Sequence, residues 1–291
     1  MLTVFNSCDN RLVKGTLPPL EKLLWAASLV LYKKCGYKLK LYCKSEDVDA
    51  LKAECLYELY DEIDTDTFDY NLNSLISEKY FWSYRKMEAL KKEFSINNNA
   101  VYSDTDILMF SLFDLNCDAL FWCMESDPLV YTDWKNISTP STYRLPQWLK
   151  DTDTAYNCGL IWFKDVSIMN EWYDEYMRFA AKNPCEVKIP DYQNTVLACN
   201  SEQRIIKGLC DKYNLNVSCI ATAEQAGLTN KGIHLYAYKQ MWKHEDLMAN
   251  LIDTSVLKSA KDELLTLCIT TLECGGYKEL AKRGEIWKTQ I

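Results

Sequence analysis

The tripeptide Asp-Thr-Asp occurs three times in this chain, at residues 64–66, 104–106 and 151–153. Only the Asp104–Asp106 copy directly follows one apolar stretch that predicts a strand, 100–102, and directly precedes another, 107–110. Two carboxylates on alternate residues at a strand end turn toward the same crevice, and such hard oxygen ligands hold Mg²⁺ or Mn²⁺. A bound ion of this kind orients a diphosphate and neutralises charge on a leaving group. We therefore expect a metal site at Asp104 and Asp106, and the alternative is that these residues only solvate a loop.

The elements that must position this motif are predicted by hydrophobic periodicity. The first 110 residues alternate strands with helices: strands at 2–5, 38–43, 55–63 and 100–102, and helices at 18–35, 48–53 and 81–94. A βαβα order predicts an α/β fold with a mainly parallel, Rossmann-like sheet flanked by helices, whose ligands lie beyond the carboxyl ends of the strands. The acidic motif lies at such an end.

The second half of the chain mixes strands and helices. Strands are expected at 119–124, 129–132, 156–163, 217–220 and 233–236, and helices at 169–181, 193–199 and 202–213. Beyond Trp242 the pattern predicts helices to the end, broken at Gly275-Gly276. With no internal repeat and no linker, the prediction is one domain over residues 1–242 and a helical C-terminal extension, 243–291, packed on it.

Composition and missing motifs exclude several classes of function. There are 41 acidic and 33 basic residues and no dense basic tract, so nucleic acid is a poor candidate partner. The chain contains no GxxxxGK[ST], GxGxxG or GxSxG motif and only two histidines. A P-loop, a dinucleotide fingerprint and a Ser/His/Asp hydrolase site are therefore not expected.

The cysteines and the N-terminal segment bear on the compartment. Thirteen cysteines without a CxxC pair, many with apolar neighbours as at Cys43, Cys123 and Cys219, favour buried thiols in a reducing compartment. The first residues lack the features of a signal peptide, and the longest apolar run, 23–32, is too short to span a membrane. We expect a cytoplasmic protein with no transmembrane segment.

Two segments around the acidic motif resemble the core of nucleotide-sugar-dependent glycosyltransferases of the GT-A fold. These are Tyr80–Leu90, a helix that bears Arg85 and Lys86, and Val101–Leu108, a strand that runs into Asp-Thr-Asp. In that family a helix with a basic residue precedes a short strand ending in the DxD metal motif. The resemblance implies that Asp104 and Asp106 bind the metal. It also implies that these two residues and Thr105 contact the donor, with Lys86 as a further donor contact.

Three later segments resemble the glycogenin-like and retaining galactosyltransferase branch, in the expected order. The strand Tyr156–Phe163 resembles the one that lines the sugar pocket, which implies that Asn157 and Gly159 contact the donor. The segment Asp191–Asn194 resembles an Asp-Gln element near the donor sugar. Here Tyr192 separates Asp191 from Gln193, so either side chain could face the sugar.

The third segment, Gly232–Leu235 followed by Lys239 and Trp242, is similar to the late His…Lys…Trp motif of the same branch. The likeness implies that His234 is the third protein ligand of the metal and that Lys239 meets the diphosphate. The chain departs from the motif at 235–238, where it has no glycine between the histidine and the lysine.

The sequence thus predicts a Mn²⁺- or Mg²⁺-dependent glycosyltransferase that moves a sugar from a nucleotide diphosphate sugar, by expectation a UDP-sugar, to an acceptor hydroxyl with retention. The catalytic candidates are Asp191, Gln193 and Lys239; the base and ribose are expected near Phe5, Asn6 and Ser7. The acceptor, whether saccharide, glycolipid or protein, is not indicated. Two alternatives stay open: a nucleotidyltransferase of similar layout, and a catalytically silent binding protein with the same fold.

Overall fold

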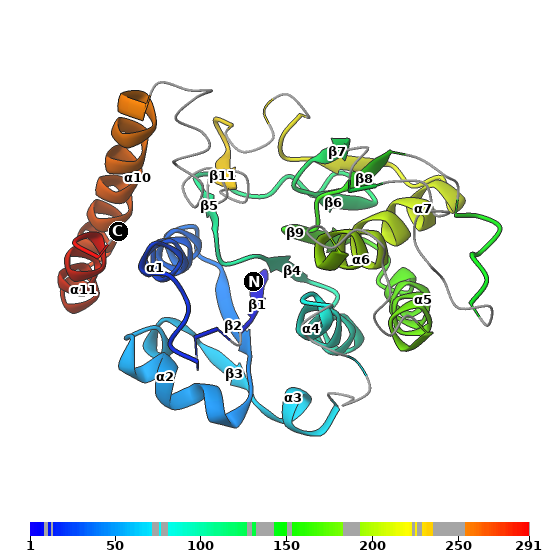
Figure 1. The fold of residues 1–291 in the computed structure, drawn as a ribbon, viewed down its shortest axis with the longest axis horizontal. Coiled ribbons are helices and arrows are strands. Elements are labelled where there is room, and N and C mark those ends of the chain that lie inside the picture. Colours follow the sequence, from blue (N-terminus) through cyan, green and yellow to red (C-terminus); the bar gives the residue numbers. More distant parts are fainter. Residues whose placement is uncertain are drawn as a thin grey trace. The chain divides into compact units, whose positions relative to one another are not determined.

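The computed structural model describes residues 1–8, 11–12, 14–71, 76, 81–126, 130–131, 143–149, 153–182, 193–222, 225, 229–234 and 254–290. The chain forms two compact units, and Figure 1 labels their helices and strands. The first unit comprises Met1–Asp64, Ser103–Leu112 and Gly227–Ile291, and the second comprises Thr65–Tyr102 and Phe113–Ala226.

The strands confirm the α/β prediction. Among the described residues, seven strands form one sheet, in the order β10 (Val217–Cys219), β6 (Ala119–Phe121), β9 (Leu160–Phe163), β4 (Ala100–Ser103), β1 (Thr3–Ser7), β2 (Lys38–Tyr42) and β3 (Glu62–Asp64). Two further pairs form small antiparallel ribbons: β11 (Gly232–His234) with β5 (Ile107–Met109), and β7 (Met124–Ser126) with β8 (Thr154–Tyr156). The pairs β1–β2, β2–β3 and β10–β6 are parallel, whereas β6–β9 is antiparallel. The sheet is therefore mainly parallel, with helices flanking it, as the element order predicts.

The first unit holds the N-terminal strands and the C-terminal helices. Its elements are β1 (Thr3–Ser7), α1 (Pro19–Lys34), β2 (Lys38–Tyr42), α2 (Val48–Ala53), β3 (Glu62–Asp64), β5 (Ile107–Met109), β11 (Gly232–His234), α10 (Thr254–Cys274) and α11 (Lys278–Lys288), with short 3₁₀ turns at Ser45–Asp47 and Tyr57–Leu59. The strand expected at 55–63 is wrong over most of its length, because residues 57–59 form a 3₁₀ turn and only 62–64 pair with β2.

The second unit is built from α3 (Asp66–Asn71), α4 (Tyr84–Ile96), β4 (Ala100–Ser103, whose last residue belongs to the first unit), β6 (Ala119–Phe121), β7 (Met124–Ser126), β8 (Thr154–Tyr156), β9 (Leu160–Phe163), α5 (Ile168–Lys182), α6 (Gln193–Cys199), α7 (Ile205–Lys212) and β10 (Val217–Cys219). A π-helical turn, Asn200–Arg204, joins α6 to α7. The stretch expected as one strand, 156–163, is two strands separated by a turn at residues 157–159.

Helix α1 is the centre of the first unit's core. It begins with Pro19 in the first turn, a position where proline's missing N–H is not needed, and Gly36 follows it with φ +77°, the left-handed conformation that ends many helices. Most of its residues are buried, and both α10 and α11 pack against it. In Figure 1 these C-terminal helices are the orange and red coils next to α1.

An ion-paired glutamate reinforces this packing. Glu54, just after α2, lies 2.7 Å from Lys22 Nζ of α1 and 2.9 Å from Arg283 Nε of α11. Burial alone would raise the pKa of Glu54, but the hydrogen bonds from its two basic partners outweigh burial and lower it. The carboxylate therefore stabilises the folded unit in its charged form.

The cysteines and the helices bear on the predictions about compartment. Cys43 and Cys123 are buried as expected, whereas Cys219 is half-buried, and no disulfide links the described cysteines. Burial raises the pKa of Cys210 and of Cys268 to about 12. Within the described residues, no helix has the length and apolar character needed to cross a lipid bilayer.

Candidate metal centre

The candidate site is built where β4 ends and β5 begins. All four residues of β4 are buried, and the chain then turns through Asp104 and Thr105, which are half-buried, to the buried Asp106. The turn is closed by a long hydrogen bond of 3.4 Å from the Ile107 amide to the Asp104 carbonyl. The two carboxylates thus stand on either side of one turn at a strand end, as the sequence predicts.

Pairing between β5 and β11 brings a histidine to these carboxylates. The strands run antiparallel with His234 opposite Ile107, the residue after Asp106. His234 Nε2 lies 3.5 Å from Asp106 Oδ1, and both side chains are almost fully buried. One ligand atom from each of Asp104, Asp106 and His234 falls within 4.8 Å of the others. The three predicted metal ligands therefore form one cluster, and no other group of this kind occurs in the described part of the chain.

The donor set fits a divalent first-row ion. Carboxylate oxygens suit Mg²⁺ and Mn²⁺, whereas an imidazole nitrogen favours the borderline transition metals, so Mn²⁺ suits the combination better than Mg²⁺. Three side-chain ligands leave coordination positions open for a substrate, the arrangement that catalytic metal sites have in general. A structural site would instead close its coordination with protein ligands.

Buried hydrogen bonds fix the backbone on the β4 side of the cluster. Asn6 of β1 donates from Nδ2 to the Ser103 carbonyl at 2.6 Å, and the Tyr32 hydroxyl of α1 lies 2.7 Å from Ser103 Oγ. Tyr60 in turn donates to Asn6 Oδ1 at 3.0 Å. Burial raises the pKa of Tyr32, so its hydroxyl stays protonated. Ser103, directly before Asp104, is held from two elements.

The β5 and β11 strands are fixed in the same way. Ser28 of α1 donates to the Ile107 carbonyl at 2.6 Å, and the Phe110 amide donates to the Lys231 carbonyl at 2.8 Å. Thr229 closes the turn before β11, because its Oγ1 accepts from the Gly232 amide at 3.1 Å. These polar side chains were not singled out from the sequence, although Ser28 and Tyr32 are the polar residues of the apolar run 23–32 within α1, which was an available signal.

The residues expected at the nucleoside have little accessible surface. Phe5 and Asn6 have none, and the Asn6 amide is taken up by Ser103 and Tyr60 as described. Ser7 is half-buried at the end of β1. In this structure, Asn6 supports the strand that carries the acidic motif.

The other predicted donor residues lie in the second unit and form a network of their own. Lys86 donates to Glu202 at 2.8 Å and to the Cys158 carbonyl at 3.1 Å. Asn157 accepts from the Gly159 amide at 2.9 Å and donates from Nδ2 to Glu125 at 2.6 Å. The structure thus brings Lys86 close to the turn that contains Asn157 and Gly159. Glu125 and Glu202 were not foreseen, because nothing local marks a glutamate as the partner of a distant lysine or asparagine.

Three predicted residues fall wholly or partly outside the described part of the chain. Asp191 and Lys239 lie outside the described residues, and only the backbone of Gln193, the first residue of α6, is described. Of the other Asp-Thr-Asp copies, the one at 64–66 is described throughout, with Asp66 exposed at the start of α3. In the copy at 151–153 only Asp153 is described, and it is exposed just before β8. Neither belongs to the metal-ligand cluster.

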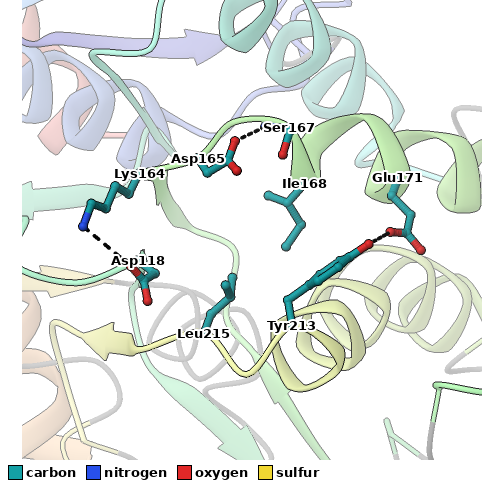
Figure 2. Close-up of a pocket in the computed structure, with 8 residues that line it drawn as sticks. All are labelled: Asp118, Lys164, Asp165, Ser167, Ile168, Glu171, Tyr213 and Leu215. Atoms are coloured by element: carbon teal, nitrogen blue, oxygen red, sulfur yellow. Dashed lines mark hydrogen bonds and ion pairs between the residues drawn. The ribbon is translucent and has the colours of Figure 1, made fainter.

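Figure 2 shows a pocket of about 360 Å³ that involves none of the predicted site residues. It is lined by eight residues of the second unit: Asp118, Lys164, Asp165, Ser167, Ile168, Glu171, Tyr213 and Leu215. Its polar groups are engaged with one another or with neighbours: Tyr213 donates to Glu171 at 2.5 Å, and the Ser167 amide donates to Asp165 at 2.9 Å. The pocket gives no reason to move the candidate site away from the acidic motif.

Comparison with known proteins adds no family assignment, since neither a protein-family model nor a curated protein matches the chain. The functional argument therefore depends on the residues and their geometry.

Proposed function

We propose that this protein is a metal-dependent glycosyltransferase of the GT-A fold that transfers a sugar from a UDP-sugar to an acceptor hydroxyl. The observation that carries the proposal is the clustering of Asp104, Asp106 and His234 at the end of a strand in a mainly parallel α/β sheet. Ligands of open α/β sheets bind outside the carboxyl ends of the strands, where this cluster lies. The histidine and the acidic motif are far apart in the sequence, and their convergence was expected only from the glycosyltransferase resemblance.

In this proposal Asp104, Asp106 and His234 hold Mn²⁺. When bound, the ion would supply positive charge to the diphosphate of the donor and to the leaving group. Lys239 is proposed to add charge at the same diphosphate, the electrostatic help that usually dominates such chemistry. Lys86, Asn157 and Gly159 are proposed at the donor sugar, with Asp191 or Gln193 beside it.

The proposed reaction exchanges one bond at the anomeric carbon for another. The bond from that carbon to the diphosphate oxygen breaks, the carbon bonds to the acceptor oxygen, and the acceptor proton passes to the departing diphosphate. We propose retention of configuration on the strength of the resemblance to the retaining branch. The cysteine-rich composition is the reason to propose a reducing, cytoplasmic setting.

The proposal is tested by thermal unfolding with UDP. Ligand binding to the native state stabilises it by about 2.7 kcal/mol at a hundredfold excess over Kd. We expect UDP with Mn²⁺ to raise Tm and UDP with a chelator to raise it far less. Equal shifts with and without metal would contradict a metal-bridged diphosphate, whereas a larger shift with another nucleotide would correct only the identity of the donor.

The variant His234→Ala separates ligation from packing. As a ligand, His234 should shift the Mn²⁺ titration midpoint to higher concentration and lower activity, with part of the activity restored by added Mn²⁺. A purely structural histidine predicts a loss of roughly 1–3 kcal/mol in stability with an unchanged Mn²⁺ midpoint. Measuring Tm beside the Mn²⁺ titration distinguishes the two roles.

A further inference from the structure

A chain of hydrogen bonds in the second unit links the segment proposed for the donor sugar to a carboxylate. Asn157 donates to Glu125 Oε1 at 2.6 Å, and the Tyr131 hydroxyl donates to Glu125 Oε2 at 2.6 Å. The Gln203 amide contacts the same tyrosine hydroxyl. Both carboxylate oxygens are therefore oriented by neutral donors.

The four residues differ in accessibility, and this decides which of them could meet a ligand. Asn157 and Tyr131 retain only 4% and 3% of their surface. Glu125 and Gln203 are half-buried. The accessible groups of the network are therefore the Glu125 carboxylate and the Gln203 amide. The buried Asn157 and Tyr131 contact these groups from the interior.

Further hydrogen bonds restrain the segment that carries Gln203. Gln203 belongs to the π-helical turn Asn200–Arg204, and turns of this type occur frequently at functional sites. Asn200 anchors this turn through hydrogen bonds of 2.8 Å from Nδ2 to the carbonyls of Val130 and Val196. Burial, followed by the charge on Glu125, raises the pKa of Tyr131, so the tyrosine remains a hydroxyl donor.

Glu125 contributes negative charge to this surface, and among the described residues it has no ion-pair partner. Within the described residues, no lysine, arginine or histidine forms an ion pair with Glu125; the partners recorded for its carboxylate are the Asn157 amide and the Tyr131 hydroxyl. Lys86, which donates to the Cys158 carbonyl next to Asn157, forms an ion pair with Glu202 at 2.8 Å. The charge of Lys86 is therefore balanced by Glu202. A ligand at Glu125 therefore meets a hydrogen-bond acceptor whose negative charge is not offset by an ion pair with any described residue.

We propose that Glu125 determines which class of sugar the enzyme accepts, by taking hydrogen bonds from the hydroxyls of a neutral hexose and disfavouring a uronic acid. Sugar hydroxyls are donors that a carboxylate binds well, because hydrogen bonds to an ionised acceptor are about twice as strong as neutral ones. The carboxylate of a uronic acid would instead place a second negative charge near Glu125, in a partly buried setting where like charges repel strongly. Gln203 adds an amide that can bond a second hydroxyl. This inference rests on the proposed function, which assigns the Asn157–Gly159 turn to the donor sugar.

The test measures the affinity of the full-length protein with Mn²⁺ for two matched pairs of donors: UDP-glucose with UDP-glucuronic acid, and UDP-galactose with UDP-galacturonic acid. Within each pair the sugars differ only in the oxidation state of carbon 6. We expect the wild type to prefer the neutral member of at least one pair by about tenfold or more, as charge repulsion at effective dielectric constants near 20 allows. Glu125→Gln should bring that ratio close to one.

Two further variants separate charge from structure. Glu171→Gln removes the same charge from another half-buried glutamate of the second unit, one that is not in the network, and should keep the wild-type ratio. Tyr131→Phe removes one hydrogen bond to Glu125 but leaves its charge, so it should lower Tm and keep most of the discrimination.

The possible outcomes are distinct. A wild-type ratio near one for both pairs, or a ratio that Glu125→Gln leaves unchanged, overturns the role of Glu125 while the glycosyltransferase proposal stands. If UDP with Mn²⁺ does not bind at all, the proposed function fails and this inference fails with it. A loss of discrimination specific to Glu125→Gln supports the assignment.

Discussion

The variant Gly232→Ala tests the geometry that joins the histidine to the acidic motif. Gly232 begins β11 opposite Met109 of β5. A Cβ atom at this position would lie 2.8 Å from the Leu108 carbonyl oxygen and 2.9 Å from Met109 Sδ, whereas ordinary contacts begin at 3.4 Å. The methionine sulfur can rotate away, but the carbonyl oxygen belongs to the backbone of β5. The two strands must therefore separate by several tenths of an ångström, and the separation occurs two residues before His234.

The size of the effect follows from this overlap. Forcing one methyl group into a packed interior costs about 1–3 kcal/mol, which for a chain of this length lowers Tm by roughly 2–10 °C. Catalytic and binding groups must be held within about 0.5 Å of their working positions. We therefore expect Gly232→Ala both to lower Tm in a thermal melt and to raise the Mn²⁺ concentration at the midpoint of a titration.

Gly284→Ala in α11 is the matched control from the same unit. The three nearest atoms to a Cβ there belong to side chains and not to the backbone: Leu23 Cδ1 at 3.1 Å, Ile269 Cγ1 at 3.3 Å and Leu272 Cδ1 at 3.7 Å. Alanine in a helix also gains up to about 1 kcal/mol over glycine, which offsets the crowding. Its Tm should stay near that of the wild type and its Mn²⁺ midpoint should not move. A wild-type Tm for Gly232→Ala would refute the claim that close approach of β11 to β5 requires glycine. A lowered Tm with an unchanged Mn²⁺ midpoint would show that this contact contributes to stability but not to metal binding.

Three further variants test the site and the charges around it. Asp106→Asn keeps the shape of the side chain but removes the charge of a proposed ligand, so it should weaken Mn²⁺ binding at least about tenfold. Tenfold is the low end of the loss of metal affinity seen when residues that hydrogen-bond to metal ligands are changed. Asp153→Asn is the control, and an equal loss of Mn²⁺ affinity there would mean that the wrong Asp-Thr-Asp copy was chosen. Glu54→Gln should lower the free energy of unfolding at pH 7 by about 1.5–3 kcal/mol, since hydrogen bonds to a charged group are lost. Because the pKa of Glu54 is lowered in the folded state, the wild-type advantage is present above the pKa of the unfolded state and should disappear as pH falls through the folded pKa. An advantage that is as large at pH 3 as at pH 7 contradicts this. Glu88→Gln has the opposite sign: burial raises the pKa of Glu88, so the wild type loses stability as pH rises through that pKa, and the variant should gain on it between pH 4 and pH 8 in denaturant titrations.

The local features of the fold could be predicted from the sequence because they depend on neighbouring residues. Pro19 and Gly36 mark the two ends of α1, and the apolar residues on either side of Asp104–Asp106 predict a strand, an acidic turn and a second strand. The interpretation of 55–63 as a strand failed because apolar residues also suit a short 3₁₀ turn packed on the core. Periodicity over so few residues does not distinguish the two.

The contacts that complete the site are long-range and could not be predicted in the same way. The pairing of β11 with β5 depends on backbone hydrogen bonds between segments more than a hundred residues apart, and no local pattern encodes that partner. His234 was expected beside the acidic motif only through the family resemblance. Glu125 was not foreseen from the sequence, since the role proposed for it follows from contacts with Asn157 and Tyr131 that are visible only in the structure.

The C-terminal helices connect to the candidate metal centre through α1. One part of α1 packs against α10 and α11, and the same helix donates from Ser28 to the Ile107 carbonyl and presents Tyr32 to Ser103. These two contacts fix the chain on both sides of the Asp104–Asp106 turn. A buried helix that is held by neighbours along its length cannot shift without breaking such hydrogen bonds, and each bond left unmade in the interior costs more than it contributes when formed. Helices α10 and α11 therefore act as structural support for the candidate metal ligands, even though no residue in them belongs to the cluster.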